Sequence, residues 1–171
     1  MEQILIPMER ARILEEKLLK EVCKRLKCRI EVHEGNNVSI DGLGYDEYNA
    51  RNVIQAFGRG FPMASAYKLL NESYFFKYID LRDMFRNKEQ IKRLKARIIG
   101  EDGRTKEYIQ SVSEVDISIY GNTIGIIGTI EGIGIATIAI ETLLGGGTHK
   151  KAYRLMELAR RKADEEGLLK K

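Results

Sequence analysis

Two glycines three residues apart, Gly100 and Gly103, lie in the stretch of the chain whose residue types best suit binding chemistry, RIIGEDGRTKEYI at residues 97–109. Because glycine has no Cβ atom, the backbone can turn sharply here and can approach a sugar-phosphate chain closely. The second glycine precedes an expected helix, and the unpaired N–H groups and dipole at a helix start favour an anion. The spacing therefore predicts a loop at residues 100–103 that binds the backbone of a nucleic acid.

The residues around this loop suit a single-stranded partner. Cations can neutralise phosphates, and isoleucines can support unpaired bases, which single strands expose and A-form duplexes hide. The predicted RNA-binding residues are Arg97, Ile98, Ile99, Gly100, Glu101, Asp102, Gly103, Arg104, Thr105, Lys106 and Ile109. The candidate auxiliary RNA contacts are Lys92, Arg93, Lys95, Arg59, Lys150 and Lys151.

Two segments of the chain concentrate positive charge. Residues 86–107 hold eight Lys or Arg residues against four Asp or Glu residues, a local net charge of +4. Residues 149–166 form an expected amphipathic helix whose polar face is basic. Such stripes are typical of proteins that bind polyanions, but they also occur as solvated helix faces, and the sequence leaves both interpretations open.

The two halves of the chain resemble each other. Residues 29–42 align with residues 116–128, and in both copies apolar and polar residues alternate, turn at Gly-Asn and alternate again. This pattern predicts a β-hairpin in each half. An apolar stripe at helical spacing follows each hairpin, namely Ala50, Val53, Ile54 and Phe57 in the first copy and Ala136, Ala139, Ile140 and Leu143 in the second.

A further strand is expected to open each half, at residues 3–6 and 76–81. The same alignment places Gly100 and Gly103 of the second copy opposite Ile13 and Glu16 of the first. The first copy therefore lacks the glycine loop, and its sequence predicts a plain helix there.

These elements predict an α+β fold made of two modules, residues 1–73 and residues 74–171. Each module is expected to be a three-stranded antiparallel sheet whose apolar face is covered by helices. Since each module is close to the lower size limit for independent stability, we expect the two to pack against each other.

The sequence gives little support for a catalytic or a metal-binding function. Cys23 and Cys28 match no zinc or redox motif, and His33 and His149 stand alone. The chain has no P-loop motif, and the glycines at residues 121–134 interrupt β-periodic isoleucines, so a dinucleotide site is not expected. No apolar run is long enough to span a bilayer, and the first residues do not form a signal peptide. We therefore expect a cytoplasmic protein without enzymatic activity, cofactor or metal.

Residues 97–144 resemble a KH domain of the type I arrangement, βααββα, with IIGEDGRTKEYI as its signature. The resemblance extends over nearly the whole chain, because residues 58–61 (GRGF), the strand near residue 78 and the RIIGxxGRTK motif occur together. In this combination the chain is similar to the archaeal and eukaryotic two-KH small-subunit ribosome-assembly factors, which partner the nuclease that trims the 3′ end of the rRNA.

The resemblance implies a first KH module without its GxxG loop and a second module that contacts single-stranded RNA. It implies that this RNA is the 3′ region of small-subunit rRNA, in ribosome biogenesis. The implied protein partners are the 3′-end nuclease, the rRNA dimethyltransferase and, in archaea, a translation initiation factor subunit.

The loop departs from the family pattern at Glu101 and Asp102, because the variable positions of such loops usually include a lysine or arginine. Two carboxylates near a phosphate weaken its binding unless neighbouring cations offset them. We therefore expect modest RNA affinity for this module alone. A protein-binding scaffold and a general KH RNA-binding regulator are the alternative functions.

Overall fold

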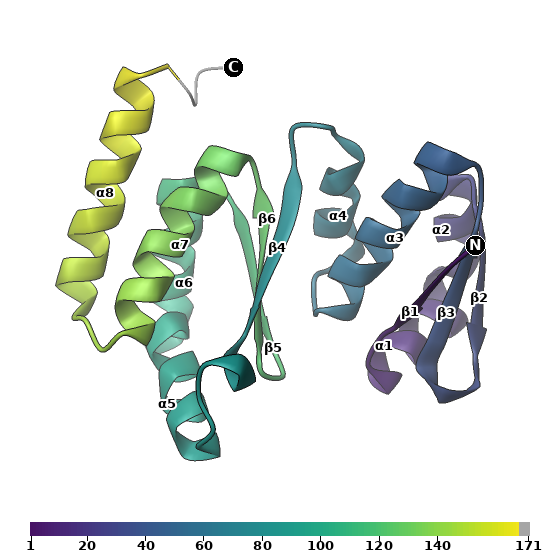
Figure 1. The fold of residues 1–171 in the computed structure, drawn as a ribbon, viewed down its shortest axis with the longest axis horizontal. Helices are drawn as coiled ribbons and strands as arrows, with labels where there is room; N and C mark the ends of the chain where they lie inside the picture. Colours follow the sequence, from purple (N-terminus) through teal and green to yellow (C-terminus); the bar gives the residue numbers. More distant parts are fainter. Residues whose placement is uncertain (168–171) are drawn as a thin grey trace. The chain divides into compact units, whose positions relative to one another are not determined.

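The computed structural model describes residues 1–167 and divides the chain into two compact units, Met1–Glu72 and Ser73–Lys171. Each unit consists of one three-stranded antiparallel sheet with helices packed on it (Figure 1). The predicted α+β fold class is therefore confirmed. The last four residues of the expected second module, 168–171, lie outside the described residues.

The sheet of the first unit has the strand order β1-β3-β2. Its strands are β1 (Glu2–Leu5), β2 (Arg29–His33) and β3 (Asn37–Asp41). The predicted hairpin is present between β2 and β3, and it turns at Gly35 and Asn36, which both have positive φ angles. Such angles favour glycine and asparagine, which explains why the repeat has Gly-Asn at this point.

The helices of the first unit pack along its sheet, α2 on β2 and α3 on β1 and β3. They are α1 (Met8–Ile13), α2 (Leu19–Leu26), α3 (Gly44–Gly58) and α4 (Met63–Ala66). A π-helical segment, Leu14–Leu18, joins α1 to α2 without a break. The predicted helix across Ile13 and Glu16 is thus continuous, but its middle is wider than an α-helix.

The second unit repeats this plan with the strand order β4-β6-β5. Its elements are β4 (Phe75–Asp80), α5 (Lys88–Ile99), α6 (Arg104–Ser113), β5 (Asp116–Tyr120), β6 (Thr123–Gly128), α7 (Ile130–Leu144) and α8 (His149–Glu165). Side-chain oxygens mark three helix starts, because those of Asn87, Thr129 and Thr148 accept hydrogen bonds from backbone N–H groups of the first turns.

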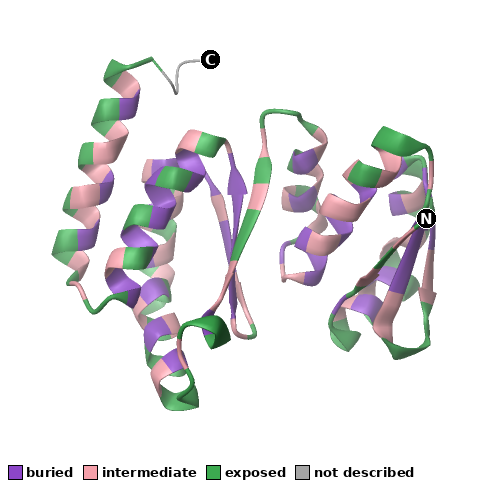
Figure 2. Cartoon of the chain, in the orientation of Figure 1, coloured by how far each residue is buried: buried purple, intermediate pink, exposed green. Residues whose placement is uncertain are grey.

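The core of the second unit lies between its sheet and its helices. In Figure 2 the buried residues of β6 and α7 stand out in purple. The cluster includes Leu81, Ile91, Leu94, Ile98, Ile109, Ile117, Ile124, Ile126, Ile140, Leu143 and Met156. Helix α8 adds to this core by packing on α6 and α7. The hairpin and the helices on either side of the glycine loop therefore belong to one packed body.

Within residues 1–167, no helix combines the length and the apolar character needed to cross a bilayer. The same residues contain no group of three or more His, Cys, Asp or Glu side chains placed to hold a metal ion.

The packing of α7 predicts unequal effects for two isoleucines on the same helix. Ile140 is fully buried, whereas Ile138 is 36% exposed. We expect Ile140→Ala to lower the free energy of unfolding by about 2–5 kcal/mol, since it leaves a cavity in the core, and Ile138→Ala to cost clearly less. Urea denaturation of the intact chain measures both, and equal losses would contradict this description of the core.

Candidate nucleic-acid interface

The chain between α5 and α6 turns abruptly at residues 100–103. Helix α5 ends at Ile99, Gly100 has φ 75° and ψ 175°, and a short 3₁₀ turn, Glu101–Gly103, leads into α6. Asp102 and Gly103 both have positive φ angles, 52° and 74°. The helix predicted for the first copy is therefore absent at the equivalent place of the second copy, and a tight loop replaces it.

Gly100 cannot be replaced without strain. A Cβ atom built on it would lie 2.2 Å from Thr105 Oγ1 and 2.8 Å from the backbone nitrogen of Thr105. Its backbone conformation is, in addition, one that essentially only glycine adopts. Thr105 is itself buried, with 5% of its surface exposed. The first glycine of the pair is thus required by the contact between the loop and the first turn of α6.

Gly103 serves a different purpose, because its surroundings are open. A Cβ atom at this position would meet no atom within 4 Å. Gly103 is the N-cap residue of α6, and no side chain caps the helix there. The first N–H groups of α6 therefore lack a side-chain acceptor, and the helix dipole at this end favours an anion such as a phosphate.

Arg97 is committed to the fold of the second unit. Its guanidinium donates hydrogen bonds to the carbonyl of Leu143, at 3.0 Å, and to the carbonyl of Gly147, at 2.5 Å. These bonds tie the end of α5 to the turn between α7 and α8. They give Arg97 a role in the fold that the sequence did not indicate, and its contact with RNA stays a prediction.

The first unit contains the same arginine contact. Arg10 aligns with Arg97 in the repeat, and its guanidinium donates to the carbonyls of Phe57, at 2.8 Å, and Phe61, at 2.5 Å. Phe57 aligns with Leu143, so both units use one arginine to fasten their first helix to the end of their third helix. We call this pair of bonds the arginine clamp. It occurs in the unit without a glycine loop and is therefore a feature of the fold.

Two of the three predicted apolar contacts are wrong. Ile98 and Ile109 are both fully buried in the core of the second unit and offer no surface to a base. They lie on the inner faces of α5 and α6, where the hydrophobic effect holds them. Ile99 is 37% exposed, directly before Gly100, so it is the isoleucine that a bound base can reach.

The remaining predicted cations lie in different settings. Arg104 is exposed and Lys106 is half-buried in the first turn of α6, and neither has an ion-pair partner among the described residues. Lys92 and Arg93 on α5 are exposed as well. Lys95 is bound to the hairpin, where its ammonium donates to the carbonyl of Gly121 at 2.8 Å. The other auxiliary candidates are Arg59 in the first unit, which is half-buried, and Lys150 and Lys151 on α8, which are exposed.

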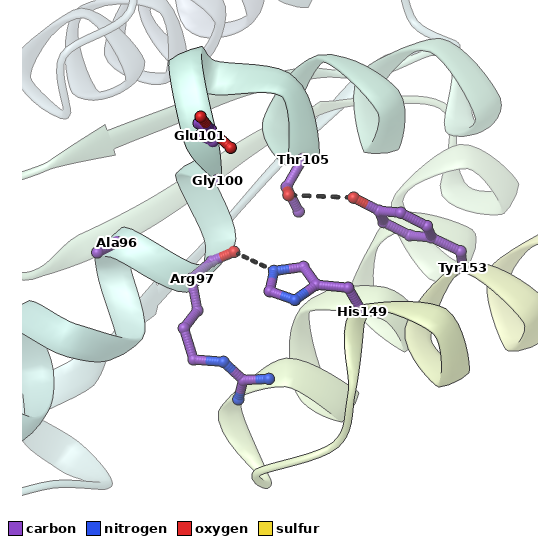
Figure 3. A pocket seen from close by; sticks show the side chains of 7 residues that line it. All are labelled: Ala96, Arg97, Gly100, Glu101, Thr105, His149 and Tyr153. Atoms are coloured by element: carbon purple, nitrogen blue, oxygen red, sulfur yellow. Dashed lines mark hydrogen bonds between the residues drawn. The ribbon is translucent and has the colours of Figure 1, made fainter.

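Sequence reasoning missed two residues of α8 that contact the loop region. His149 Nε2 lies 2.9 Å from the carbonyl oxygen of Arg97, and the Tyr153 hydroxyl donates to Thr105 Oγ1 at 3.0 Å (Figure 3). Helix α8 thus holds the residues on both sides of the glycine loop. The helical pattern of residues 149–166 indicated its apolar face but carried no signal for these contacts.

Tyr108 connects α8 to α6 beside this contact. Its ring meets that of Tyr153 edge to face, with centroids 4.7 Å apart, and its hydroxyl donates to the carboxylate of Glu157. That hydrogen bond, more than burial, raises the pKa of Tyr108 above its usual value. The ring therefore stays neutral at physiological pH and serves to pack α8 against α6.

The different surroundings of the two glycines predict different stabilities for their alanine variants. Gly100→Ala combines a clash with Thr105 and a strained backbone, which alone costs about 1–3 kcal/mol. For Gly103→Ala, the only expected cost is that of the left-handed backbone conformation, about 1–2 kcal/mol in the free energy of unfolding. We expect Gly100→Ala to be the more destabilising of the two in urea denaturation, and the reverse order would show that the loop geometry is wrong.

Comparison with known protein families identifies the second unit. A model of the second KH domain of PNO1 proteins, described as a eukaryotic type KH-domain (KH-domain type I), matches residues 75–161. The KH domain-containing protein MJ0443 from Methanocaldococcus jannaschii is 35% identical over 165 residues, which cover 92% of this chain and 73% of the relative.

A fungal relative and a solved structure extend the comparison. The pre-rRNA-processing protein PNO1 of Chaetomium thermophilum is 29% identical over 138 residues, 79% of this chain, which spans about half (51%) of that protein's length. In the crystal structure of the a/eIF2alpha-aDim2p-rRNA complex from Pyrococcus horikoshii OT3, the matching chain has a TM-score of 0.86 and 34% identity, with 94% of each chain covered. The family match, the relatives and the repeated architecture agree, and the chain belongs to the PNO1-type KH-domain family (KH-domain type I).

Proposed function

We propose that this chain is a non-catalytic RNA-binding factor of small-subunit ribosome biogenesis, which holds single-stranded pre-rRNA at residues 100–103. The observation that carries the proposal is the break between α5 and α6, where the start of α6 has no side-chain cap and the space beside Gly103 is open. In KH domains such a GxxG loop clamps the backbone of about four nucleotides.

The two halves of the chain take different roles in this proposal. We assign residues 74–171 to the KH module that binds RNA and residues 1–73 to a KH module that has lost this capacity. In the first module the helix continues through the π-helical segment Leu14–Leu18, so no helix start is exposed at the equivalent position. The arginine clamp is kept in both modules because it serves the fold and not the ligand.

The acidic residues of the loop limit the affinity of the module. Glu101 and Asp102 are both exposed, so water screens their repulsion of a phosphate. A pair of charges 4 Å apart contributes about 1 kcal/mol in water against about 4 kcal/mol at a partly shielded protein surface. The exposed Arg104 and the neighbouring Lys106 offset this repulsion. We therefore expect modest affinity, raised by protein contacts on the assembling subunit.

The relatives support the choice of partners. Dim2p of Pyrococcus horikoshii was solved in a complex with rRNA and eIF2alpha. We propose the 3′ region of small-subunit rRNA as the RNA and the α subunit of the initiation factor as a protein partner. The 3′-end nuclease and the rRNA dimethyltransferase are further proposed partners, by family resemblance, and the cytoplasm is the proposed location.

The open position of Gly103 provides a test of RNA binding that leaves folding intact. We expect Gly103→Asp to weaken binding of single-stranded RNA by about tenfold or more, because a carboxylate at the loop repels the phosphate and excludes its close approach. Fluorescence anisotropy with a labelled oligonucleotide from the 3′ end of small-subunit rRNA measures the loss.

Gly35→Asp is the matched control. Gly35 has a φ angle of 75°, against 74° for Gly103, and a Cβ atom at either position would meet nothing within 4 Å. Both variants therefore carry the same charge and similar backbone strain, but Gly35 lies in the first unit. If both bind RNA as tightly as the unaltered chain, residues 100–103 do not hold the strand.

The salt dependence of binding identifies the phosphate contacts. For single strands, log Kd rises with log salt concentration with a slope of about 0.7 for each phosphate that a protein cation neutralises. We expect Arg104→Ala/Lys106→Ala to lower this slope by about 1.4. Lys17→Ala/Lys20→Ala removes two exposed cations from the aligned helix of the first unit and should leave the slope unchanged. An equal effect of both pairs would indicate a general charge attraction without a site.

A further inference from the structure

A pocket adjoins the glycine loop on the side of α8. Its volume is about 400 Å³, and it is lined by Ala96, Arg97, Gly100, Glu101, Thr105, His149 and Tyr153. Figure 3 shows these residues converging from the end of α5, the loop, the start of α6 and the first turns of α8. The pocket is a shallow hollow that is largely open to solvent, so it can receive part of a chain that continues along the surface. Because Gly100 and Glu101 belong to both, the pocket and the loop form one continuous surface.

The pocket offers hydrogen-bonding and aromatic groups. The carbonyl of Arg97 can only accept a hydrogen bond, so His149 Nε2 carries the hydrogen of that contact. In the neutral ring, Nδ1 is then an acceptor, and it has no partner among the described residues. The ring of Tyr153 lies beside it, with the two centroids 6.2 Å apart. An acceptor next to aromatic surface suits a nucleotide, which brings a ribose hydroxyl and a base with a π face.

Positive charge is concentrated along α8, the helix that contributes His149 and Tyr153 to the pocket. Residues 150–162 contain six Lys or Arg residues and one carboxylate, a net charge of +5. The one carboxylate, Glu157, accepts the hydrogen bond of Tyr108. Lys150, Lys151 and Arg154 are exposed in the first turns of the helix and make no ion pair within residues 1–167.

Lysines at this end of a helix weaken the helix itself. The helix dipole places partial positive charge at the N-terminus, so acidic residues are favoured there and cations are unfavourable. The first turn of α8 nevertheless has no acidic residue and contains Lys150 and Lys151, and only the Thr148 hydroxyl caps it. Because Lys150 and Lys151 destabilise the start of α8, their presence is better explained by binding of an anionic ligand than by solvation alone.

We propose that the pocket and the first turns of α8 form a second nucleotide subsite, which receives the RNA next to the nucleotides held by the glycine loop. The base and ribose of the adjoining nucleotide enter the pocket against His149 and Tyr153. Its phosphates lie toward the start of α8, where Lys150 follows His149 on the near side of the helix, and Lys151, on the far side, adds positive charge at longer range. This inference rests on the proposed function of the loop and extends the bound strand beyond it in one direction.

Glu101 is the single acidic residue of the pocket lining. A carboxylate accepts hydrogen bonds from amino and imino groups of bases, and it repels phosphates. At the rim of a nucleotide pocket it favours a strand that turns its base edge toward the loop and its phosphates toward α8. The acidic position that weakens phosphate binding at the loop then contributes to orienting the nucleotide in the pocket.

Strand length tests the subsite separately from the loop. The probes are fluorescein-labelled single-stranded RNAs of four nucleotides and of six nucleotides, with the two added nucleotides at the 5′ side in one hexamer and at the 3′ side in the other. A hexamer offers three registers for a four-nucleotide site, so it gains up to about threefold by statistics alone. We expect at least one hexamer to bind the intact chain at least about tenfold more tightly than the tetramer, because it adds charge-neutralising phosphate contacts.

The variant that removes the subsite is Lys150→Ala/Lys151→Ala. We expect this variant to bind the tetramer with the same affinity as the unaltered chain. We expect it to bind the hexamer no more tightly than the register statistics allow. Its thermal midpoint should be equal or higher, since two unfavourable charges leave the helix start. Arg161→Ala/Lys162→Ala is the matched control, with the same charge change about 16 Å further along the axis of α8. It should keep the gain.

The outcomes separate this inference from the proposed function. If the tetramer binds and neither hexamer binds more than about threefold more tightly, the subsite is wrong. The subsite is also wrong if the tighter hexamer binding persists in Lys150→Ala/Lys151→Ala. Neither result contradicts RNA binding by the loop. The second result would assign the charge of α8 to solvation or to an acidic protein surface. Failure of the unaltered chain to bind any of the three RNAs overturns the proposed function and the subsite together.

Discussion

The proposed binding surface depends on one constraint, the contact between Gly100 and Thr105. It brings the backbone of the loop so close to the first turn of α6 that a Cβ atom would lie 2.2 Å from the threonine hydroxyl. Because Gly100 has no Cβ atom, the chain can make this approach and break between α5 and α6, and no side chain caps the start of α6 at Gly103. The same repeat unit without this contact, in the first half of the chain, forms a continuous helical run through a π-helical segment.

Comparing the two units separates the contacts that serve the fold from those that we propose to serve the ligand. The arginine clamp joins corresponding elements in both, through Arg10 in the first and Arg97 in the second. Within residues 1–167, only the second unit combines the clamp with a glycine loop and with a further helix, α8. That helix fixes both flanks of the loop through His149 and Tyr153. A loop held from both sides loses little freedom when it binds, which favours affinity for a flexible strand.

Much of this arrangement could be predicted from the sequence, because residues close together in the chain determine the hairpins, the helices and the glycine loop. The predictions were incomplete or wrong where distant residues decide. Arg97 contacts carbonyls 46 and 50 residues further along the chain, and nothing in its own neighbourhood indicates this. The repeat could have indicated it, since Arg10 stands at the aligned position. Ile98 was predictable as a core residue, since Ile91, Leu94 and Ile98 share one helix face. Its nearness to the glycines favoured the wrong interpretation.

The central claim is that the main chain at residues 100–103 holds a single strand of RNA and that the aligned stretch of the first unit does not. A titration of the ¹⁵N-labelled chain with single-stranded RNA, followed through the amide resonances, tests it most directly. The account predicts that the amides of Gly100, Gly103 and Arg104 shift, while those of Ile13 and Glu16 stay in place. Unchanged amides at the loop, with shifts confined to the first unit, would contradict it.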